Sequence, residues 1–358
     1  MQQKMMYYIY IVRLKFTSPV RFGADYSGIG IEGAQPFVHS DTLFSALCNA
    51  WVRFGIFTHD ELAIYGEKFL LSSASFYVYK GSATYFMPKP FIPCVWLKGL
   101  KTSKKEKLEK IIKKTHWVTS GMFKHWLNPS PPSGIFQEIP NMLVDAIDYG
   151  SLFHERIVAR HAQDRLTNAS NLFYETLYEF KDTPTCGLYF LVALKDASFE
   201  EKFNLGLKAL SKIGLGGKRC FGLGRFEVSN GNGVLCPIET DGSELGFILE
   251  TGSNSLRCLF SLSLPTQIEI DNLMSIYDDK VAQYDIVLRK GWTFSSVNLC
   301  QMKRQTIYML SEGSVFEESL CPSGRIENVA PLDGQNNIDF PHHVFRFGKS
   351  FSVPLKSY

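Results

Sequence analysis

The feature that most constrains the fold of this chain is the glycine-rich run KIGLGGKRCFGLGRF at residues 212–226. Residues 204–211 before it have the apolar spacing of a helix, and residues 224–228 at its end have the composition of a strand. The order helix, glycine loop, strand is the reverse of the dinucleotide-binding fingerprint, in which a strand precedes the glycines and a helix follows. The run is therefore typical of a connection at the edge of a sheet and not of a Rossmann domain.

This loop also has the composition of an anion-binding segment. Glycine permits positive φ, so that successive N–H groups can turn outward towards a ligand. Six Lys and Arg residues and no acid occur from Lys202 to Phe226, so we expect a uniformly positive local field. The Gly-Lys-Ser/Thr end of a P-loop is absent, which excludes that class of phosphate site. A polyanion lying across a sheet edge and a purely structural turn are both compatible with the spacing.

The composition excludes several other classes of protein. The chain has 358 residues, room for two domains, and its 45% hydrophobic and 20% charged residues are typical of a globular protein. No apolar run approaches the roughly 20 residues that span a bilayer, and no signal peptide is recognisable, so we expect a cytoplasmic protein without membrane association. The eight cysteines contain no C-x-x-C pair and lie apart from the histidines in sequence. We therefore expect no disulfides, no metal and no cofactor.

The first half of the chain alternates strand and helix patterns. Strands are expected at residues 7–16, 69–80, 85–97 and 186–194, and a helix begins at Ser40 or Asp41 and continues to about residue 54. Residues 98–114 contain eight lysines and predict a short amphipathic helix. We expect those lysines to be solvated and not to contact a polyanion.

Residues 151–180 combine basic and aromatic side chains. If the basic residues converge they can bind phosphates, and the aromatic residues can stack on unpaired bases. The basic set is Arg156, Arg160, His161 and Arg165, and the aromatic set is Phe173, Tyr174 and Tyr178. On composition alone, a polar loop followed by core aromatics fits equally well.

The second half repeats the pattern of the first more weakly. Residues 230–246 contain four glycines and a proline and predict a linker between two domains. After it, strands are expected at residues 256–264, 286–294, 305–310 and 344–354, with a helix at residues 268–278.

Five runs of this sequence resemble one family of RNA-binding CRISPR proteins. The glycine loop resembles that of the RAMP superfamily, and the runs SPVRFG (18–23) and HSDTLFSALCNAW (39–51) resemble its family of subunit four of the type III-A Csm complex. An Arg-x₃-Asp-Arg-x-Thr motif of that family is matched by Arg160, Asp164, Arg165 and Thr167. The C-terminal motif of the family is matched by Phe345, Arg346, Gly348 and Phe351.

The resemblance implies an α+β fold of two RRM-like (ferredoxin-like) domains. The first would span residues 1–231, with the glycine-rich loop and an insertion at about residues 85–180, and the second would span residues 232–358. It also implies a non-catalytic subunit that holds the 5′ repeat-derived tag of the CRISPR RNA (crRNA). Its protein partners would be the large polymerase/cyclase-type subunit and the backbone RAMP subunit. The RNA-binding residues then expected are Arg21, His39, Ser40, Arg156, Arg160, His161, Arg165, Thr167, Gly214, Gly216, Gly217, Lys218, Arg219, Cys220, Gly222, Gly224 and Arg225.

A second function of the same superfold stays open at this point. Some relatives are metal-independent endoribonucleases that process crRNA, which requires a base for the 2′-OH and a cation for the developing charge. The candidates here are His39, His161 and Lys218, and nothing in the sequence brings them together. A small-molecule phosphate enzyme is disfavoured, because the chain shows neither a metal-binding carboxylate pair nor a Walker lysine.

Overall fold

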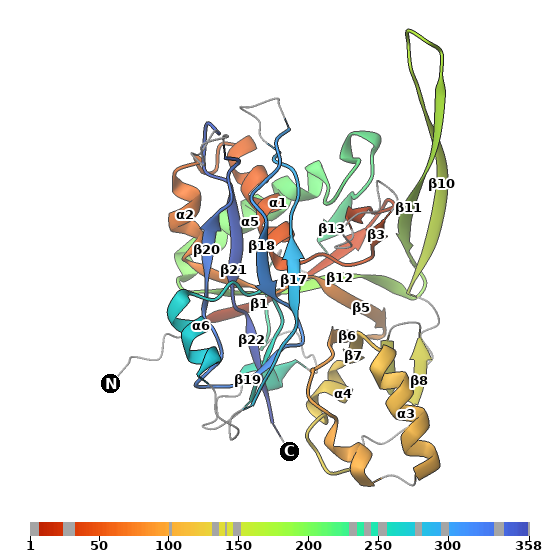
Figure 1. Ribbon diagram of the computed structural model, residues 1–358, viewed down its shortest axis with the longest axis vertical. Coiled ribbons are helices and arrows are strands. Elements are labelled where there is room, and N and C mark those ends of the chain that lie inside the picture. Colours follow the sequence, from red (N-terminus) through yellow and green to blue (C-terminus); the bar gives the residue numbers. More distant parts are fainter. Residues whose placement is uncertain are drawn as a thin grey trace.

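The computed structural model shows a mixed α/β protein built on antiparallel sheets (Figure 1). The described residues are 7–23, 33–99, 102–130, 136–139, 142–145, 152–228, 235–239, 245–249, 256–275, 281–294, 301–332 and 340–356. Within this part of the chain, no helix is long and apolar enough to cross a membrane.

A ten-stranded sheet organises the first half, in the order β13-β1-β12-β5-β6-β7-β9-β8, with β14 beside β1 and β4 beside β12. Its strands are β1 (Tyr8–Phe16), β4 (Phe69–Leu71), β5 (Ser75–Lys80), β6 (Ser82–Pro88), β7 (Trp117–Thr119), β8 (Phe136–Ile139), β9 (Met142–Asp145), β12 (Thr185–Leu194), β13 (Phe226–Val228) and β14 (Cys236–Pro237). The central strand β12 is buried from Cys186 to Leu194, as its continuous apolar run predicts.

Two helices pack side by side against this sheet: α1 (Ser40–Arg53) and α5 (Glu200–Ile213). Four residues of the predicted apolar stripe of α1 are buried, whereas the fifth, Phe54, follows the end of the helix and is 55% exposed. The buried residues are Leu43, Phe44, Leu47 and Trp51. A Cβ added at Gly206 of α5 would lie 2.0 Å from the indole nitrogen of Trp51, so this glycine permits the close helix–helix approach. A shorter helix, α2 (Glu61–Gly66), follows α1.

The chain between β5 and β12 forms two additions to the sheet. The first contains β6 to β9 with η1 (Val95–Gly99), α3 (Thr102–Lys114) and α4 (Ser120–Lys124). The second is a long hairpin, β10 (Phe153–Gln163) and β11 (Ser170–Phe180), which projects from the body as an arm (Figure 1). The reading of residues 151–180 as a polar loop is wrong from residue 153 onwards, because two paired strands of 11 residues occupy it. The expected strand at 85–97 is also wrong beyond Pro88, since residues 95–99 form a 3₁₀ turn.

The second half contains three smaller sheets. Four strands lie in the order β16-β19-β15-β22, and the pairs β17–β18 and β20–β21 stand beside them. Their bounds are β15 (Leu256–Leu259), β16 (Ala282–Gln283), β17 (Ile286–Arg289), β18 (Ile307–Leu310), β19 (Val315–Glu317), β20 (Gly324–Asn328), β21 (Phe345–Lys349) and β22 (Ser352–Leu355), with α6 at Gln267–Met274. The single strand expected at 344–354 is thus two strands, separated where the Phe351 N–H donates to the Ser261 hydroxyl.

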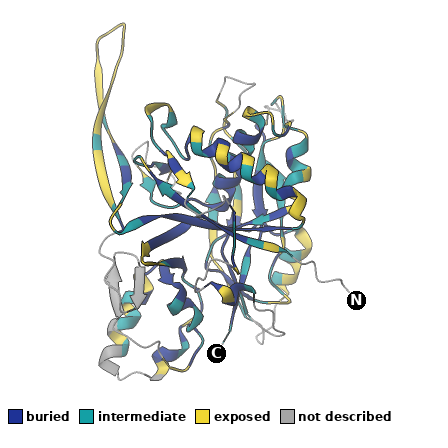
Figure 2. Ribbon diagram, turned by 180° about the vertical axis from the view of Figure 1, so that it is seen from behind, coloured by how far each residue is buried: buried dark blue, intermediate teal, exposed yellow. Residues whose placement is uncertain are grey.

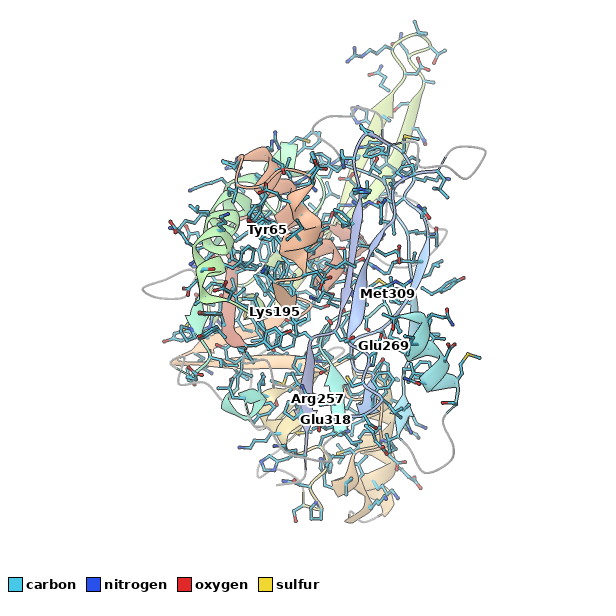
Figure 3. The ribbon with its side chains drawn as sticks, turned by 90° about the vertical axis from the view of Figure 1, so that its left-hand side faces the viewer. Tyr65, Lys195, Arg257, Glu269, Met309 and Glu318 are labelled. Atoms are coloured by element: carbon cyan, nitrogen blue, oxygen red, sulfur yellow. The ribbon has the colours of Figure 1, made fainter. Side chains whose placement is uncertain are left out.

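The two halves share continuous hydrophobic packing. The ring of Phe347 on β21 lies 4.7 Å from that of Phe44 on α1, and both belong to one buried cluster that includes β1 and β12. A side view places Tyr65 of α2 in a layer beside that of Met309 on β18 and Glu269 on α6 (Figure 3). Figure 2 shows this buried seam as a dark interior, while the arm is largely exposed.

The segment expected to be a linker is partly core. Among its described residues, Cys236 and Pro237 pair with β1, and Leu235 and Ile238 are buried. A glycine-rich composition is compatible both with a solvated linker and with a segment that packs on the first sheet, so the sequence could not distinguish the two. Two short strands near the sheet edge, β2 (Phe22–Gly23) and β3 (Ala34–Gln35), complete the fold.

Candidate nucleic-acid interface

The glycine-rich loop joins α5 to β13 as predicted, and its backbone requires glycine at two positions. Gly216 has φ +100, and a Cβ there would lie 2.7 Å from the carbonyl oxygen of Arg21. Gly224 has φ +74, and a Cβ there would lie 2.0 Å from the carbonyl oxygen of Leu215. Gly214 and Gly222 also have positive φ, as does Lys218 at φ 56. The loop is therefore a tightly folded turn against neighbouring backbone.

The SPVRFG run supplies most of that neighbouring backbone. The N–H of Gly224 donates to Pro19 O at 2.8 Å, and the N–H of Arg225 donates to the Ser18 hydroxyl at 2.9 Å. The Arg21 guanidinium lies beside the loop, since a Cβ at Gly217 would be 3.7 Å from its Nη1. Two runs that are nearly 200 residues apart in the sequence thus form one surface.

Gly217 differs from the expectation for this loop. Its φ is not positive, and its N–H donates to Arg21 O at 2.8 Å, so that N–H is not directed at a ligand. In the described part of the chain, no protein acceptor pairs with the N–H of Gly216, Lys218, Arg219 or Cys220. These four N–H groups lie within residues 216–220 and are available to bind an anion.

The loop contacts the arm on one side and the second half of the chain on the other. The Lys218 ammonium lies 2.9 Å from Glu175 Oε1 on β11, and Arg160 Nε lies 3.6 Å from the other oxygen of that buried carboxylate. The Arg219 guanidinium lies 4.9 Å from the ring centroid of Phe294. The field around the loop is therefore not uniformly positive, because Glu175, distant in sequence, partly neutralises Lys218.

The strand register divides the candidate residues of the arm between two faces. Arg160 pairs with Phe173, and Arg156 lies four residues away on the same face, which is also that of Glu175. His161 pairs with Leu172 on the opposite face. The four basic side chains therefore do not converge, and Arg156 is paired with Glu179 at 3.1 Å.

The tip of the arm is a tight turn organised by Asp164. Its Oδ1 accepts the N–H of Leu166 at 2.7 Å and that of Thr167 at 3.2 Å, and these bonds lower the pKa of Asp164. Asp164 is thus a turn cap. Arg165 and Thr167 are exposed at the tip. Tyr178, expected to stack on bases, is buried at the other end of the hairpin, where its hydroxyl donates to Ala34 O.

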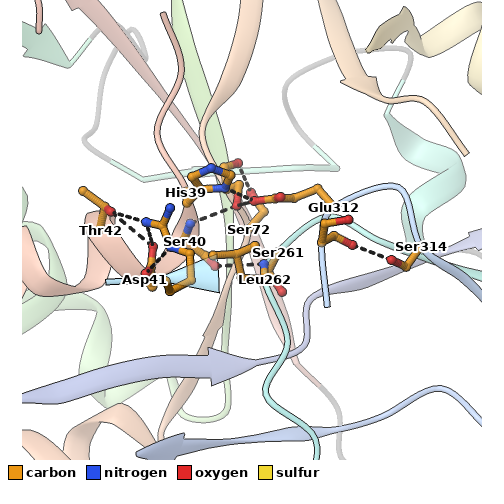
Figure 4. Close-up of polar contacts among 12 residues, drawn as sticks. His39, Ser40, Asp41, Thr42, Ser72, Ser261, Leu262, Glu312 and Ser314 are labelled. Atoms are coloured by element: carbon orange, nitrogen blue, oxygen red, sulfur yellow. Dashed lines mark hydrogen bonds and ion pairs between the residues drawn. The ribbon is translucent and has the colours of Figure 1, made fainter. Parts of the chain in front are cut away.

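The His39-Ser40-Asp41 run lies in the interface between the two halves (Figure 4). The Ser40 hydroxyl accepts the N–H of Leu262 at 3.1 Å. The Asp41 carboxylate accepts from Arg289 at 2.9 Å through two nitrogens and also pairs with Arg346. Ser40 and Asp41 are buried to 1% exposure or less.

The His39 imidazole faces a buried acid. Its Nδ1 lies 2.7 Å from Glu312 Oε1, and the Ser73 hydroxyl donates to the same carboxylate. Burial alone lowers the pKa of His39, but the Glu312 carboxylate outweighs it and raises that pKa above its ordinary value. For Glu312, burial raises the pKa, and the facing imidazole together with two hydrogen bonds lowers it overall. The pair is therefore a buried ion pair.

These contacts give His39 and Ser40 a role between the two halves, apart from the glycine loop. They also separate the three residues considered for RNA cleavage: His39 faces Glu312, Lys218 faces Glu175, and His161 is on the far face of the arm. Sequence reasoning missed Glu312, Arg289 and Glu175, since each is an ordinary charged residue until the fold brings its partner to it. Within the described ranges, no cluster of His, Cys, Asp and Glu is arranged to hold a metal ion.

Comparisons with known proteins give one consistent family. The family described as "CRISPR Csm4 C-terminal domain" matches residues 253–355. "CRISPR system Cms protein Csm4" of Methanocaldococcus jannaschii is 25% identical over 96% of both chains, and the protein of that name from Thermococcus onnurineus is 25% identical over 88% of this chain and 91% of its own. The Csm4 protein of Streptococcus thermophilus is 27% identical over 45% of this chain and 46% of its own.

Solved structures share the fold over nearly the whole chain. A chain of a Csm3–Csm4 subcomplex of the type III-A interference complex matches with a TM-score of 0.62 at 16% identity, covering 98% of this chain and 100% of that one. A chain of a Csm1–Csm4 cassette in complex with cA4 matches with a TM-score of 0.58 at 17% identity, covering 98% and 99%. In its sequence motifs, in residues 253–355 and over nearly its full length, the chain is thus similar to the Csm4 proteins of type III-A CRISPR systems.

Proposed function

We propose that this chain is a non-catalytic, cytoplasmic RNA-binding subunit of a type III-A CRISPR effector complex, and that it holds the 5′ tag of the crRNA. The observation that carries the proposal is the glycine loop, in which Arg21, Lys218 and Arg219 surround unpaired N–H groups at the junction of the arm and the second half. Cations and N–H donors on one surface suit a phosphate backbone.

The RNA would continue from the glycine loop onto the arm. Arg156 and Arg160 lie on the arm face shared with Glu175, and Arg165 and Thr167 lie at its tip. His161 would reach RNA only from the opposite face. Gly214, Gly222 and Gly224 would act by shaping the loop, and Cys220 and Arg225 by lining it.

The proposed protein partners are a large polymerase/cyclase-type subunit and a backbone RAMP subunit. Structures similar in fold to this chain come from assemblies named for Csm1 with Csm4 and for Csm3 with Csm4. We propose that counterparts of these two subunits bind this chain.

The domain organisation proposed is two RRM-like domains, at residues 1–231 and 232–358, with an insertion at about 85–180 in the first. Support for the first comes from the order β13-β1-β12-β5 with α1 and α5 as crossover helices, which is the 4-1-3-2 order of a βαββαβ ferredoxin-like unit. For the second, support is limited to the four-stranded antiparallel sheet and α6.

Copurification tests the proposal. The full chain is co-expressed with the large subunit, the backbone subunit and a CRISPR array, and the RNA bound to it is crosslinked by ultraviolet light and sequenced. We expect crosslinks between peptides of the glycine loop or the arm and the repeat-derived 5′ end. A complex that carries this chain but has its 5′ tag crosslinked entirely to other subunits would contradict the proposal.

The non-catalytic part needs its own assay. Repeat RNA incubated with the purified chain, with and without Mg²⁺, should remain intact. Cleavage that is lost in His161→Ala, a variant of an exposed side chain, would favour the endoribonuclease instead.

A further inference from the structure

A short segment of the second half, residues 291–294, separates two concave pockets. Its N–H and carbonyl groups bond to residues 302–304: the N–H of Thr293 donates to Met302 O at 2.8 Å, and Arg304 Nε donates to Trp292 O at 2.9 Å. The Thr293 side chain is 3% exposed, whereas the rings of Trp292 and Phe294 are 56% and 46% exposed. Because successive side chains of an extended segment point to opposite sides, the rings of Trp292 and Phe294 face solvent while Thr293 between them is buried.

The two rings line different pockets. Trp292 lines a pocket of about 660 Å³, together with Lys290, Lys303 and Arg304. Phe294 lines a pocket of about 360 Å³, together with Arg53, Arg304 and His59. Both volumes lie in the range of small-ligand sites. Among the described residues, no Asp or Glu lines either pocket.

Each of these two rings also makes a cation–π contact. Lys303 Nζ lies 5.7 Å from the centroid of Trp292, and the Arg219 guanidinium lies 4.9 Å from that of Phe294. Arg219 belongs to the glycine loop, where Lys218 lies 5.6 Å from the centroid of the exposed ring of Phe221. The exposed rings and their cations therefore continue the glycine-loop surface into the second half of the chain.

We propose that Trp292 and Phe294 are stacking platforms for two unpaired bases of a bound RNA strand, with the adjoining phosphates on Arg219, Lys303 and Arg304. This inference rests on the proposed function and adds to it a base-binding surface in the second half. Every nucleobase has a π-face, so exposed aromatic rings beside cations bind unpaired strands.

The charge of the two pockets favours RNA over a protein partner at this place. Burial and neighbouring Arg346 lower the pKa of Arg304 to about 10 against the opposing effect of Asp41, so another cation lies near this guanidinium. The burial of Arg219 and its proximity to Arg53 likewise lower the pKa of Arg219. Because no acid among the described residues lines these two pockets, a bound polyanion would reduce the repulsion between their cations.

Two oligoribonucleotide probes separate stacking from phosphate binding. The full-length chain is titrated with a fluorescein-labelled eight-nucleotide RNA and with an abasic strand of the same length, which has the same phosphates. In the variant W292A/F294A we expect about a tenfold loss of affinity for the RNA per ring removed, the scale of base–aromatic stacking. The affinity for the abasic strand and the salt dependence should stay unchanged, because no charge is removed.

Tyr8→Ala is the matched control. Tyr8 has an exposed ring with the same 46% exposure as Phe294, but it lies at the start of β1, whose other end contacts the glycine loop. This variant should bind both probes as the wild type does. The conservative variant W292F/F294Y should regain most of the lost RNA affinity, and circular dichroism should show all variants folded.

The tryptophan itself gives a direct signal. Trp292 is the exposed one of five tryptophans, since Trp51, Trp96, Trp117 and Trp126 are at most 7% exposed. RNA binding should quench tryptophan emission and protect it from acrylamide, and both effects should vanish in W292F. The abasic strand should produce neither effect.

The possible failures are distinguishable. If the wild type binds RNA and the abasic strand equally, without quenching, the stacking inference is overturned while the proposed function stands. If the wild type binds no RNA in isolation or in its complex, the proposed function fails and the inference fails with it. If W292A/F294A keeps its RNA affinity but no longer copurifies with another subunit, the rings form a protein interface and the inference is wrong.

Discussion

The glycine loop and the residues His39 and Ser40 are both predicted from the sequence to bind RNA, and they have opposite environments. The charges of the loop are at least partly exposed, and Lys218 and Arg160 share one carboxylate while remaining on the surface. The charges of the second region are buried: Asp41 lies between Arg289 and Arg346, and His39 lies against Glu312. Similar polar residue types therefore remain at the surface in one place and join the two halves of the protein in the other.

This difference has an energetic reason. Removing one member of a buried ion pair leaves an uncompensated charge out of water, whereas exposed pairs are screened by solvent. Substitutions in the interface should therefore change stability, and substitutions in the loop and arm should change RNA binding. Four predictions test this division between the two regions.

Asp41→Ala should destabilise the protein most. It leaves the buried guanidinium groups of Arg289 and Arg346 without their shared carboxylate, so we expect a loss of about 3–5 kcal/mol in the free energy of unfolding. Urea denaturation followed by circular dichroism measures it. Asp164→Ala, at the exposed tip of the arm, is the control and should change stability far less. A stable Asp41→Ala protein that has lost only RNA binding would reverse the division between the two regions.

Gly216→Ala should weaken RNA capture, while its neighbour Gly217→Ala should not. The first places a Cβ at φ +100 within 2.7 Å of Arg21 O, so the loop must shift at a cost of about 1–3 kcal/mol. The second has no positive φ, and its Cβ would find ordinary contact at 3.5 Å. RNA affinity and thermal unfolding are measured for both variants. Equal RNA affinity of the two folded variants would reduce the loop to a structural turn.

The salt dependence of RNA binding distinguishes the arm from helix α3. Arg165→Ala should weaken binding and flatten the slope of log affinity against log salt by roughly 0.7, the effect of one phosphate contact on a single strand. The triple variant of Lys104, Lys105 and Lys107 should change neither, since α3 lies away from the arm and the glycine loop (Figure 1). A larger loss in the lysine variant would place the RNA on the α3 side of the molecule.

The His39–Glu312 pair should produce a modest pH dependence of stability. The folded pKa of His39 is raised above its ordinary 6.5, so its contribution is complete below that value and is lost as pH rises through the folded pKa. The folded pKa of Glu312 is lowered from 4.5, so its contribution is present above that value and is lost as pH falls through the folded pKa. Urea midpoints should therefore fall on both sides of a window spanning weakly acidic to neutral pH.

The variant H39Q provides the check for this pH effect. It removes the titrating imidazole, so the alkaline decline in the urea midpoint should flatten relative to the wild type. An unchanged alkaline decline in H39Q would mean that another group is responsible. Circular dichroism should show the variant folded.

Elements whose cause is local could be predicted from the sequence. The apolar stripe of α1, the continuous apolar run of β12 and the glycines after α5 each depend on residues within one or two turns, so spacing and backbone freedom were sufficient to predict them. The matched motifs also indicated the family. The arm was not recognised, because polar side chains on both of its faces remove the alternation that normally reveals a strand.

Which polar residues face each other depends on the tertiary fold. Asp41 and Arg289 are 248 residues apart, and Lys218 reaches Glu175 across the base of the arm. Such pairs have no signature in sequence, because any Asp, Glu, Lys or Arg is equally suited until packing brings two of them together and excludes water. For the same reason, pairing register rather than spacing put His161 on the face opposite Arg160. The sequence shows where polar residues occur, but whether each one is buried or exposed depends on contacts between segments that are hundreds of residues apart.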